Sequence, residues 1–400
     1  MVKFNFAETE KMTEKKSIYW EKFPWLKVKK SAKKEVFYLF GILPVFYRPL
    51  LFVDDNTFVV WEPCSGSHGE VIPGFAQYLL DMGYTVSVIL HKGHHKDGLF
   101  SRMQHEKLFL NNLSRKQAKR YFKNADISKL QGILVTTMGK LCADSDVEEA
   151  QGHFSETISR DKLFFVEHDA KIAIDENRWN SNIITLRKLN YKGAQSVVVN
   201  PHHFGEVAIT PKNQDKVNFI TVGAINPKRK NSSTIIDAVK KLHERGVRNF
   251  KVTVIGKGKI DEIPSEVRPY LDIKGRLNFD KMYEELEKAD FMLTSYDPDN
   301  ELHQRYNTVG TSGNFQLAYG FGKPCIIVKD FSALNGFSEK NSIIYDCASN
   351  YADAMQRAIE MSADEYKNMQ KELCNYADEL YSCSKSNFSD FIRRTIEGDV

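Results

Sequence analysis

The sequence has little net charge and few residues that mark special classes of protein. Among its 400 residues, 56 lysines and arginines stand against 52 acidic residues, which gives a formal net charge of +4. So small a charge provides no protein-wide positive field, and we expect no nucleic-acid partner. Hydrophobic residues make up 42% and charged residues 27% of the chain. This balance excludes a disordered or fibrous chain, and the length favours two globular domains.

Paired cysteines and long apolar runs are also absent from the sequence. None of the six cysteines lies in the CxxC spacing typical of structural zinc sites: Cys64, Cys142, Cys325, Cys347, Cys374 and Cys383. Isolated cysteines fit a reducing compartment. The start of the sequence does not resemble a secretory signal, and no run of about 20 apolar residues could cross a bilayer. We therefore expect a cytoplasmic protein.

Basic residues are concentrated at the N-terminus. Residues 1–35 contain ten lysines and five glutamates, and residues 36–47 are rich in Phe, Tyr and Leu. A cationic segment beside an aromatic one fits the headgroup region of an anionic membrane, where each lysine contributes about 1 kcal/mol. The alternative is a solvated helix that leads into a buried strand or docking segment. The pattern makes residues 1–48 a candidate for peripheral attachment to the inner face of the membrane.

From Thr57 onward, short β-rich runs alternate with helical ones, which is typical of βα units on a parallel sheet. The first set of expected strands covers residues 58–61, 86–90, 133–136, 163–166 and 196–199, with a helix at 75–82. The second set covers residues 217–222, 252–255, 271–273, 291–294 and 324–328, with helices at 233–245 and 279–289. The end of the chain, at 364–381 and 387–397, reads as helical.

A polar stretch at residues 210–216 separates the two sets and has the composition of a linker. We predict an α/β protein with two Rossmann-like, doubly wound domains that face a cleft, and a helical C-terminal tail. The expected parts are an N-terminal segment (1–48), two Rossmann-like domains (49–210 and 211–381), and a final helix that packs back on the first domain (382–400). Ligands of open α/β folds bind at the carboxyl ends of the strands, so we expect the site there.

Two strand ends in the first half carry candidate catalytic or binding residues. The loop after the first strand contains Gly66, Ser67, His68, Gly69 and Glu70. Small residues there let the backbone approach a ligand, although the pattern is not the GxGxxG of dinucleotide sites, and an ordinary tight connection is the alternative.

The expected strand at 163–166 ends next to His168 and Asp169. A histidine at a strand end can exchange a proton near neutral pH, and a neighbouring carboxylate can orient it. The alternative for a lone histidine is a structural role.

Candidate phosphate-binding residues follow the strands of the second half. Lys228, Arg229 and Lys230 lie between a strand and a helix, where consecutive cations suit a diphosphate, although a solvated turn is the alternative. The hydroxyls and glycines before the helical run at 315–321 predict an anion pocket that needs no metal: Gly310, Thr311, Ser312, Gly313 and Asn314. Further candidates at strand ends are Gly256, Lys257, Arg276 and Leu277. The acidic pair Asp297 and Asp299 has a metal-binding spacing, but the intervening proline favours a turn, and we expect no metal site.

Four segments resemble, in order, the nucleotide-sugar-binding half of GT-B glycosyltransferases. They are VGAINPKRKNSSTIIDAVKKL, VTVIGKG, IKGRLNFDKMYEELEKADFMLTS and GTSGNFQLAYGFGKPCIIV, within about residues 217–360. The likeness is strongest to the large retaining family that includes bacterial lipopolysaccharide and capsule enzymes. FFVEHD and NPHHFGEV in the first half are more weakly similar. The resemblance implies cofactor-free, metal-independent transfer of a hexosyl group from a nucleotide sugar, with a UDP-sugar favoured, to a cell-surface glycan or lipid-linked acceptor in polysaccharide biosynthesis.

The resemblance also assigns roles to single residues. Lys230 matches the lysine that neutralises the donor diphosphate, and His168 matches the histidine near the transferred sugar. The sequence departs from the family where Ala224 replaces an arginine, for which Arg229 or Lys228 would substitute. It departs again where Val309 and Leu317 replace two glutamates.

The missing glutamates imply a different recognition of the donor hydroxyls, for which Thr311, Ser312 and Asn314 are the candidates. Retention of configuration is slightly favoured. An inverting enzyme would instead need His168, Asp169, His68 or Glu70 as a base. Two further hypotheses stay open, namely a nucleotide-sugar epimerase and a noncatalytic sugar-nucleotide-binding subunit.

Overall fold

A computed structural model describes the chain except for short stretches at residues 1–2, 7–16, 21–22, 31–33, 41, 65–67, 91–93, 95, 125–126, 143–145, 181–182, 224–231, 259, 261–262 and 398–400. The chain divides into two compact units. The first comprises Met1–His95, His105–Glu167 and Ser389–Val400, and the second comprises Lys96–Gln104 and His168–Phe388. The expected linker at 210–216 therefore lies inside the second unit.

Five parallel strands in the first unit run in the order β10-β9-β6-β7-β8. Their bounds are β6 (Thr57–Trp61), β7 (Thr85–Leu90), β8 (Leu108–Asn112), β9 (Gly132–Val135) and β10 (Leu163–Glu167). The helices include α1 (Ile72–Asp81), α2 (Arg115–Asn124) and α3 (Val147–Gln151). Every residue of β6 is buried, as expected for a central strand covered on both faces. Because β6 has β7 on one side and β9 on the other, the chain order reverses beside it, which is where ligands of such sheets bind.

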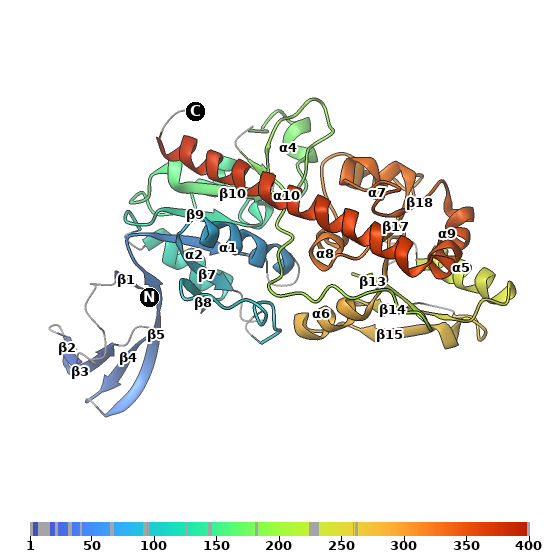
Figure 1. The fold of residues 1–400 in the computed structure, drawn as a ribbon. Helices are drawn as coiled ribbons and strands as arrows, with labels where there is room; N and C mark the ends of the chain where they lie inside the picture. Colours follow the sequence, from blue (N-terminus) through green and yellow to red (C-terminus); the bar gives the residue numbers. More distant parts are fainter. Residues whose placement is uncertain are drawn as a thin grey trace. The chain divides into compact units, whose positions relative to one another are not determined.

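The N-terminal segment of the first unit forms a separate small sheet, drawn in blue in Figure 1, in the order β1-β5-β4-β3-β2. Its strands are β1 (Lys3–Phe6), β2 (Ser17–Trp20), β3 (Phe23–Lys30), β4 (Lys34–Leu39) and β5 (Leu43–Val53). Leu26 and Phe37 are buried in it. The alternative of a solvated helix is therefore wrong for these strands. Lysines alternate with apolar residues around Val28, and this period of two suits a strand.

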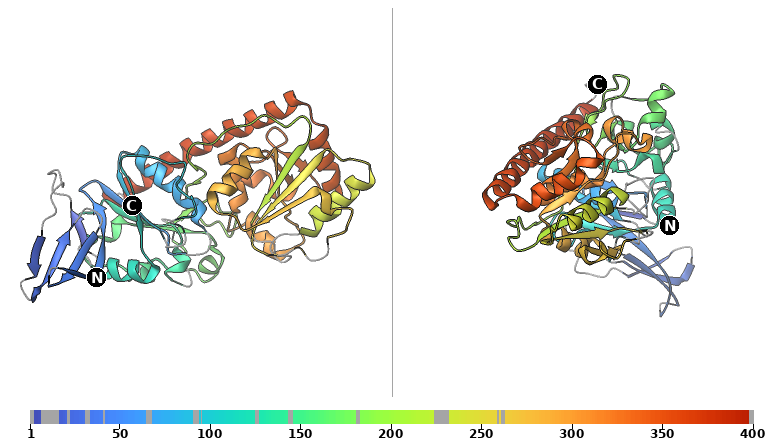
Figure 2. Two further views of the ribbon diagram at one scale, coloured as in Figure 1. Left: turned by 90° about the horizontal axis from the view of Figure 1, so that it is seen from below. Right: turned by 90° about the vertical axis from the view of Figure 1, so that its right-hand side faces the viewer.

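Six parallel strands form the sheet of the second unit in the order β15-β14-β13-β16-β17-β18. They are β13 (Val217–Val222), β14 (Phe250–Ile255), β15 (Leu271–Gly275), β16 (Phe291–Leu293), β17 (Cys325–Val328) and β18 (Ile343–Tyr345). Figure 2 shows helices on both faces of this sheet. They include α5 (Ser232–Glu244), α6 (Phe279–Lys288), α8 (Gly313–Phe321) and α9 (Tyr351–Glu360). The shorter elements are α4 (Lys171–Asp175), α7 (Glu301–Gln304) and the paired strands β11 (Ile184–Thr185) and β12 (Val197–Val198).

The C-terminal helix α10 (Ala363–Glu397) is one continuous element of 35 residues, whereas the sequence predicts two helices. The expected break at residues 382–386 contains no glycine or proline, and a serine inside a helix costs only about half a kcal/mol relative to alanine. Residues up to Phe388 belong to the second unit and later ones to the first. Within the first unit, the Phe391 ring lies 5.5 Å from the Phe164 ring. In the described part of the chain, no helix has both the length and the apolar character needed to span a membrane.

The loop between β7 and β8 contributes Lys96–Gln104 to the second unit, which the sequence does not predict. The Phe279 amide donates a hydrogen bond to the Asp97 carbonyl oxygen over 2.6 Å at the start of α6. Arg102 forms a two-pronged ion pair with Glu287 on the same helix. The pair holds the Glu287 pKa below its ordinary value, chiefly through the hydrogen bond from Arg102. These contacts make the loop part of the second unit's helical layer.

Candidate functional site

Two candidate segments that are far apart in the sequence meet at Gly310 in the second unit. Asp169 and Gly310 form an isolated antiparallel bridge. Arg305 Nη2 lies 3.1 Å from Asp169 Oδ2, and the Gly310 amide donates to the Arg305 carbonyl oxygen over 2.8 Å. The expected catalytic pair His168 and Asp169 therefore adjoins the expected anion-binding loop. We call Asp169, Arg187, Arg305 and Gly310 the Gly310 junction.

Arg187 supplies a buried positive charge to this junction. Its Nε donates to the Gly310 carbonyl oxygen over 2.7 Å and its Nη1 to the Lys188 carbonyl oxygen over 3.0 Å. Within the described part of the chain, Nη2 has no hydrogen-bond partner. Burial lowers the pKa of Arg187 to about 10, so the side chain remains charged at neutral pH. A buried guanidinium that contacts only neutral acceptors is costly for folding, which is typical of a functional group.

Gly310 needs the absence of a side chain for this close approach. A Cβ atom placed there would lie 3.0 Å from the His168 carbonyl oxygen and 3.5 Å from Arg305 Nε. The first distance, to the residue before Asp169, is tighter than an ordinary van der Waals contact, and the second is to Arg305 of the junction. A glycine at this position therefore allows the loop to lie against the strand end.

The start of α8 lies two residues after Gly310. Ser312 caps this helix, because its Oγ accepts a hydrogen bond from the Asn314 amide over 3.3 Å. The buried Tyr296 hydroxyl donates to the same oxygen. Burial raises the pKa of Tyr296 well above its ordinary value, so the hydroxyl stays protonated. Thr311 is half-buried, and Gly313 is the first residue of the helix. The first turn of such a helix offers backbone amides to an anion.

The other candidates of the second unit are differently placed. The Gly256 amide already donates to the Gly275 carbonyl oxygen over 2.9 Å. Lys257 and Arg276 are exposed next to these strand ends. Leu277 packs against the hydrophobic core of the second unit. The predicted diphosphate residues Arg229 and Lys230 lie outside the described residues.

The first unit carries a buried carboxyl at the carboxyl end of β6. Glu62 is 2% exposed and accepts hydrogen bonds from the Cys64 amide (2.5 Å), Thr136 Oγ1 (2.6 Å) and Thr137 Oγ1 (2.7 Å). Desolvation outweighs these three donors and raises the pKa of Glu62 to about 8. Glu62 is not among the residues predicted from the sequence, although its place between a strand and Pro63 is a signal of a functional residue.

The predicted loop of the first unit follows directly. His68 is half-buried with a left-handed backbone (φ 68), Gly69 is buried, and Glu70 is half-buried. The negative charge of Glu70 contributes to the raised pKa of Glu62. Gly66 and Ser67 lie outside the described residues.

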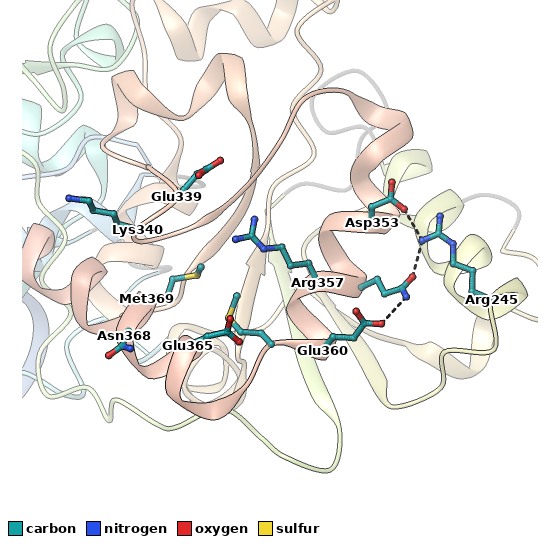
Figure 3. A pocket seen from close by; sticks show the side chains of 11 residues that line it. Arg245, Glu339, Lys340, Asp353, Arg357, Glu360, Glu365, Asn368 and Met369 are labelled. Atoms are coloured by element: carbon teal, nitrogen blue, oxygen red, sulfur yellow. Dashed lines mark hydrogen bonds and ion pairs between the residues drawn. The ribbon is translucent and has the colours of Figure 1, made fainter.

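A cavity of about 720 Å³ lies elsewhere in the second unit, between α5, α9 and α10 (Figure 3). Charged side chains of both signs line it, and Arg245 pairs with Asp353 there over 2.8 Å. None of the predicted site residues contributes to its wall. No group of three or more His, Cys, Asp or Glu side chains in the described ranges is arranged to hold a metal ion. The Asp299 amide donates to Asp297 Oδ1 over 3.0 Å, which is the hydrogen bond of a turn.

No protein-family model and no curated protein matches the sequence. Among solved structures, AviGT4, a glycosyltransferase involved in avilamycin A biosynthesis, is similar with a TM-score of 0.51 and 13% identity. The match covers 85% of this chain and 98% of AviGT4. WaaG, a glycosyltransferase involved in lipopolysaccharide biosynthesis, has a TM-score of 0.47 and 12% identity over 84% of this chain and 99% of its own. The pneumococcal O-GlcNAc transferase GtfA, in complex with UDP and GlcNAc, has a TM-score of 0.44 and 15% identity over 66% of this chain and 56% of its own.

The likeness to AviGT4 shows the fold. The predicted GT-B architecture, with two parallel-sheet α/β domains and a helical C-terminal region, is confirmed.

Proposed function

We propose that this chain is a glycosyltransferase that moves a hexosyl group from a nucleotide sugar to a glycan or lipid-linked acceptor. A UDP-sugar is the favoured donor. The observation that carries the proposal is the Gly310 junction, where a buried cation, the start of a capped helix and the His168–Asp169 strand end lie together. The GT-B fold supports the proposal, because AviGT4, which shares this fold, is a glycosyltransferase.

In this proposal the second unit binds the donor. The diphosphate contacts the amides of residues 311–313, and Arg229 and Lys230, which precede α5 in the sequence, neutralise its charge. Negative charge grows on the leaving phosphate during transfer, and fixed cations and amides stabilise it without reorganising. Arg187 adds a positive potential behind the loop and holds the Gly310 carbonyl oxygen away from the phosphate.

His168 is proposed to lie beside the transferred sugar, with Asp169 held in place by Arg305. We favour retention of configuration, in which the acceptor attacks the same face that the leaving group departs from. In an inverting reaction His168 or Asp169 would instead accept the acceptor proton. His68, Gly69 and Glu70 of the first unit are the proposed acceptor contacts.

A noncatalytic sugar-nucleotide-binding subunit is the second candidate, and one observation favours it. Val309 and Leu317, at the positions where the family has glutamates, are 2% and 3% exposed and belong to buried apolar surroundings. No carboxylate is therefore available at those positions to hold donor hydroxyls.

A panel of UDP, GDP, CDP and ADP in a thermal-shift assay tests donor binding directly. A ligand present at 100 times its dissociation constant adds about 2.7 kcal/mol to the free energy of unfolding, which raises the melting temperature measurably. We expect UDP to give the largest shift.

Incubation with UDP-sugars then separates the hypotheses. Transfer to an acceptor or slow donor hydrolysis supports the transferase. A new sugar without acceptor supports an epimerase, and UDP binding without turnover supports the noncatalytic subunit.

A further inference from the structure

A cluster of large apolar side chains is exposed at one end of the small N-terminal sheet. Its members are Trp25 (45% exposed), Phe40 (72%), Ile42 (84%), Leu43 (59%) and Val45 (46%). They come together because the Phe40 amide donates to the Trp25 carbonyl oxygen over 2.7 Å and because β4 turns into β5 at this point. We call these five residues the apolar turn. A contiguous group of this kind marks an interaction surface more often than scattered exposed side chains do.

The backbone conformation of Phe40 in the apolar turn indicates that the Phe40 side chain has a function. Phe40 has a left-handed backbone with φ 50. A bulky residue in this region is strained, whereas glycine or asparagine adopts it readily. An exposed phenylalanine contributes little to the core, so neither burial nor backbone preference explains Phe40. Strain without a folding benefit points to selection for an external contact.

The residues along β3 and β4 are graded from apolar to cationic with distance from the turn. Trp25 lies at the turn. Two residues further along β3, Lys27 pairs with Tyr38 of β4. Lys29 and Lys30 follow, paired with Val36 and Glu35. Because a strand rises about 3.3 Å per residue, Lys27 lies about 7 Å and Lys29 about 13 Å behind Trp25. Residues 17–45 contain six lysines and two glutamates in all. The strands β3 and β4 themselves contain four lysines and one glutamate, so they carry a net positive charge.

This gradient matches the layers of an anionic membrane surface. Apolar side chains enter the boundary between headgroups and acyl chains to a depth of about 5–10 Å. Trp and Tyr are enriched at the level of the headgroups. Lysines behind them are attracted to anionic lipids. A protein partner would need an apolar surface with acidic residues placed behind it, whereas an anionic bilayer offers both layers over its whole surface.

We propose that the apolar turn inserts into the surface of an anionic bilayer and that Lys27, behind it on β3, binds the headgroups. The chain is then a peripheral membrane protein whose small N-terminal sheet is the attachment element. This inference does not depend on the proposed transfer reaction, since attachment needs neither donor nor acceptor.

Vesicle sedimentation of the full-length protein tests the proposal. We expect sedimentation with vesicles that contain about 30% phosphatidylserine but little with phosphatidylcholine alone, and a strong decrease at about 0.5 M NaCl. The double variant Ile42→Ser and Leu43→Ser should bind at least ~10-fold more weakly, because both side chains would lose their place in the boundary layer. The matched control replaces two exposed leucines elsewhere, Leu110→Ser (42% exposed) and Leu302→Ser (57% exposed), and should bind like the wild type.

Phe40→Asn is a second turn variant, and we expect it to fold because asparagine suits the left-handed backbone. We expect it to keep or raise the melting temperature while it binds vesicles at least ~5-fold more weakly. Unchanged sedimentation of both turn variants would overturn the proposal, as would a wild type that stays in the supernatant with both vesicle types. Light scattering adds a further test: a dimer that only the turn variants dissociate, without vesicle binding, would assign the surface to a second copy and overturn the membrane assignment.

Discussion

Arg187 Nε donates a hydrogen bond to the Gly310 carbonyl oxygen over 2.7 Å, so a buried guanidinium fixes the loop that leads into α8. This contact orients the peptide that follows Gly310. In a trans peptide the carbonyl oxygen and the next N–H point in opposite directions, so the Thr311 amide points away from Arg187. A loop with a fixed amide binds an anion without first being ordered, which favours affinity. The buried charge thus has a use that offsets its cost to folding.

Replacement of Arg187 by methionine separates the cost of the buried charge to folding from its contribution to anion binding. The variant Arg187→Met removes an uncompensated buried charge while it keeps most of the side-chain volume. We expect the free energy of unfolding to stay within about 1 kcal/mol of the wild type or to rise. Binding of UDP, measured by calorimetry, should weaken about tenfold, or about 1.4 kcal/mol. The exposed Arg268→Met serves as the control, and UDP affinity equal to that of the wild type in Arg187→Met would remove Arg187 from the site.

A methyl group at Gly310 should impair the reaction more than the fold. In Gly310→Ala the new Cβ lies 3.0 Å from the His168 carbonyl oxygen, so the strand end and the loop must separate by a few tenths of an ångström. We expect a loss of stability of about 1 kcal/mol and a fall in transfer rate of at least ~10-fold. Gly139→Ala is the control, because its Cβ would meet nothing closer than 3.6 Å. Normal turnover in Gly310→Ala would show that the contact has no role in catalysis.

His168 is expected to act on the sugar rather than on the nucleotide. His168→Ala should lower the transfer rate by about 100-fold or more, the usual effect of a proton-transferring or sugar-contacting group. The dissociation constant of UDP should change little. Steady-state kinetics and UDP calorimetry on the same preparation provide the measurement, with His243→Ala on α5 as a matched histidine control. A loss of UDP binding equal to the loss of rate would contradict the assignment.

Glu62 makes stability depend on pH in the first unit. Its pKa is raised from 4.5 to about 8, so the folded state binds a proton that the unfolded state releases in this range. The stabilisation is present below about pH 4.5 and is lost as the pH rises towards 8, by up to about 5 kcal/mol at about 1.4 kcal/mol per pKa unit. Burial lowers the pKa of His202 to about 4. This histidine therefore makes the free energy of unfolding rise, not fall, as the pH increases from 4 to 6.5.

The difference between wild type and Glu62→Gln isolates this effect from other titrating groups. Glutamine has nearly the same shape and is uncharged, as is the protonated carboxyl. Urea unfolding at pH 5.5 and pH 8 should show the wild type losing stability relative to Glu62→Gln as the pH rises. Parallel pH dependence of the two proteins would mean that Glu62 is ionised in the fold.

The alternation of apolar runs and helical segments was enough to predict the parallel strands, because these strands are buried on both faces and read as apolar runs. The expected strand at 217–222 coincides with β13, and the end of the expected strand at 163–166 correctly places His168 at a strand end. The strand β8 was missed because its residues Leu108–Asn112 end in two asparagines and are only partly buried. The edge of a sheet imposes a weaker pattern than its centre.

Arg187 and Glu62 could not be found from local sequence. Lys188 follows Arg187, and a basic pair in a polar stretch is typical of a solvated loop. Burial of a charged side chain depends on segments that are distant in the chain, here Gly310 for Arg187 and Thr136 for Glu62. The continuity of α10 and the docking of residues 96–104 on α6 have the same origin, since tertiary packing rather than local preference decides both.

Calorimetric titration of UDP into the wild type, Lys230→Ala and Lys240→Ala tests whether cations that precede α5 in the sequence and amides at the start of α8 hold a diphosphate. Lys240 is exposed on α5 and serves as the matched control. We expect at least ~10-fold weaker binding in Lys230→Ala, with a melting temperature close to that of the wild type, because Lys230 is assigned a role in binding and none in folding. Equal UDP affinity in all three proteins would contradict the assignment of Lys230 to the diphosphate.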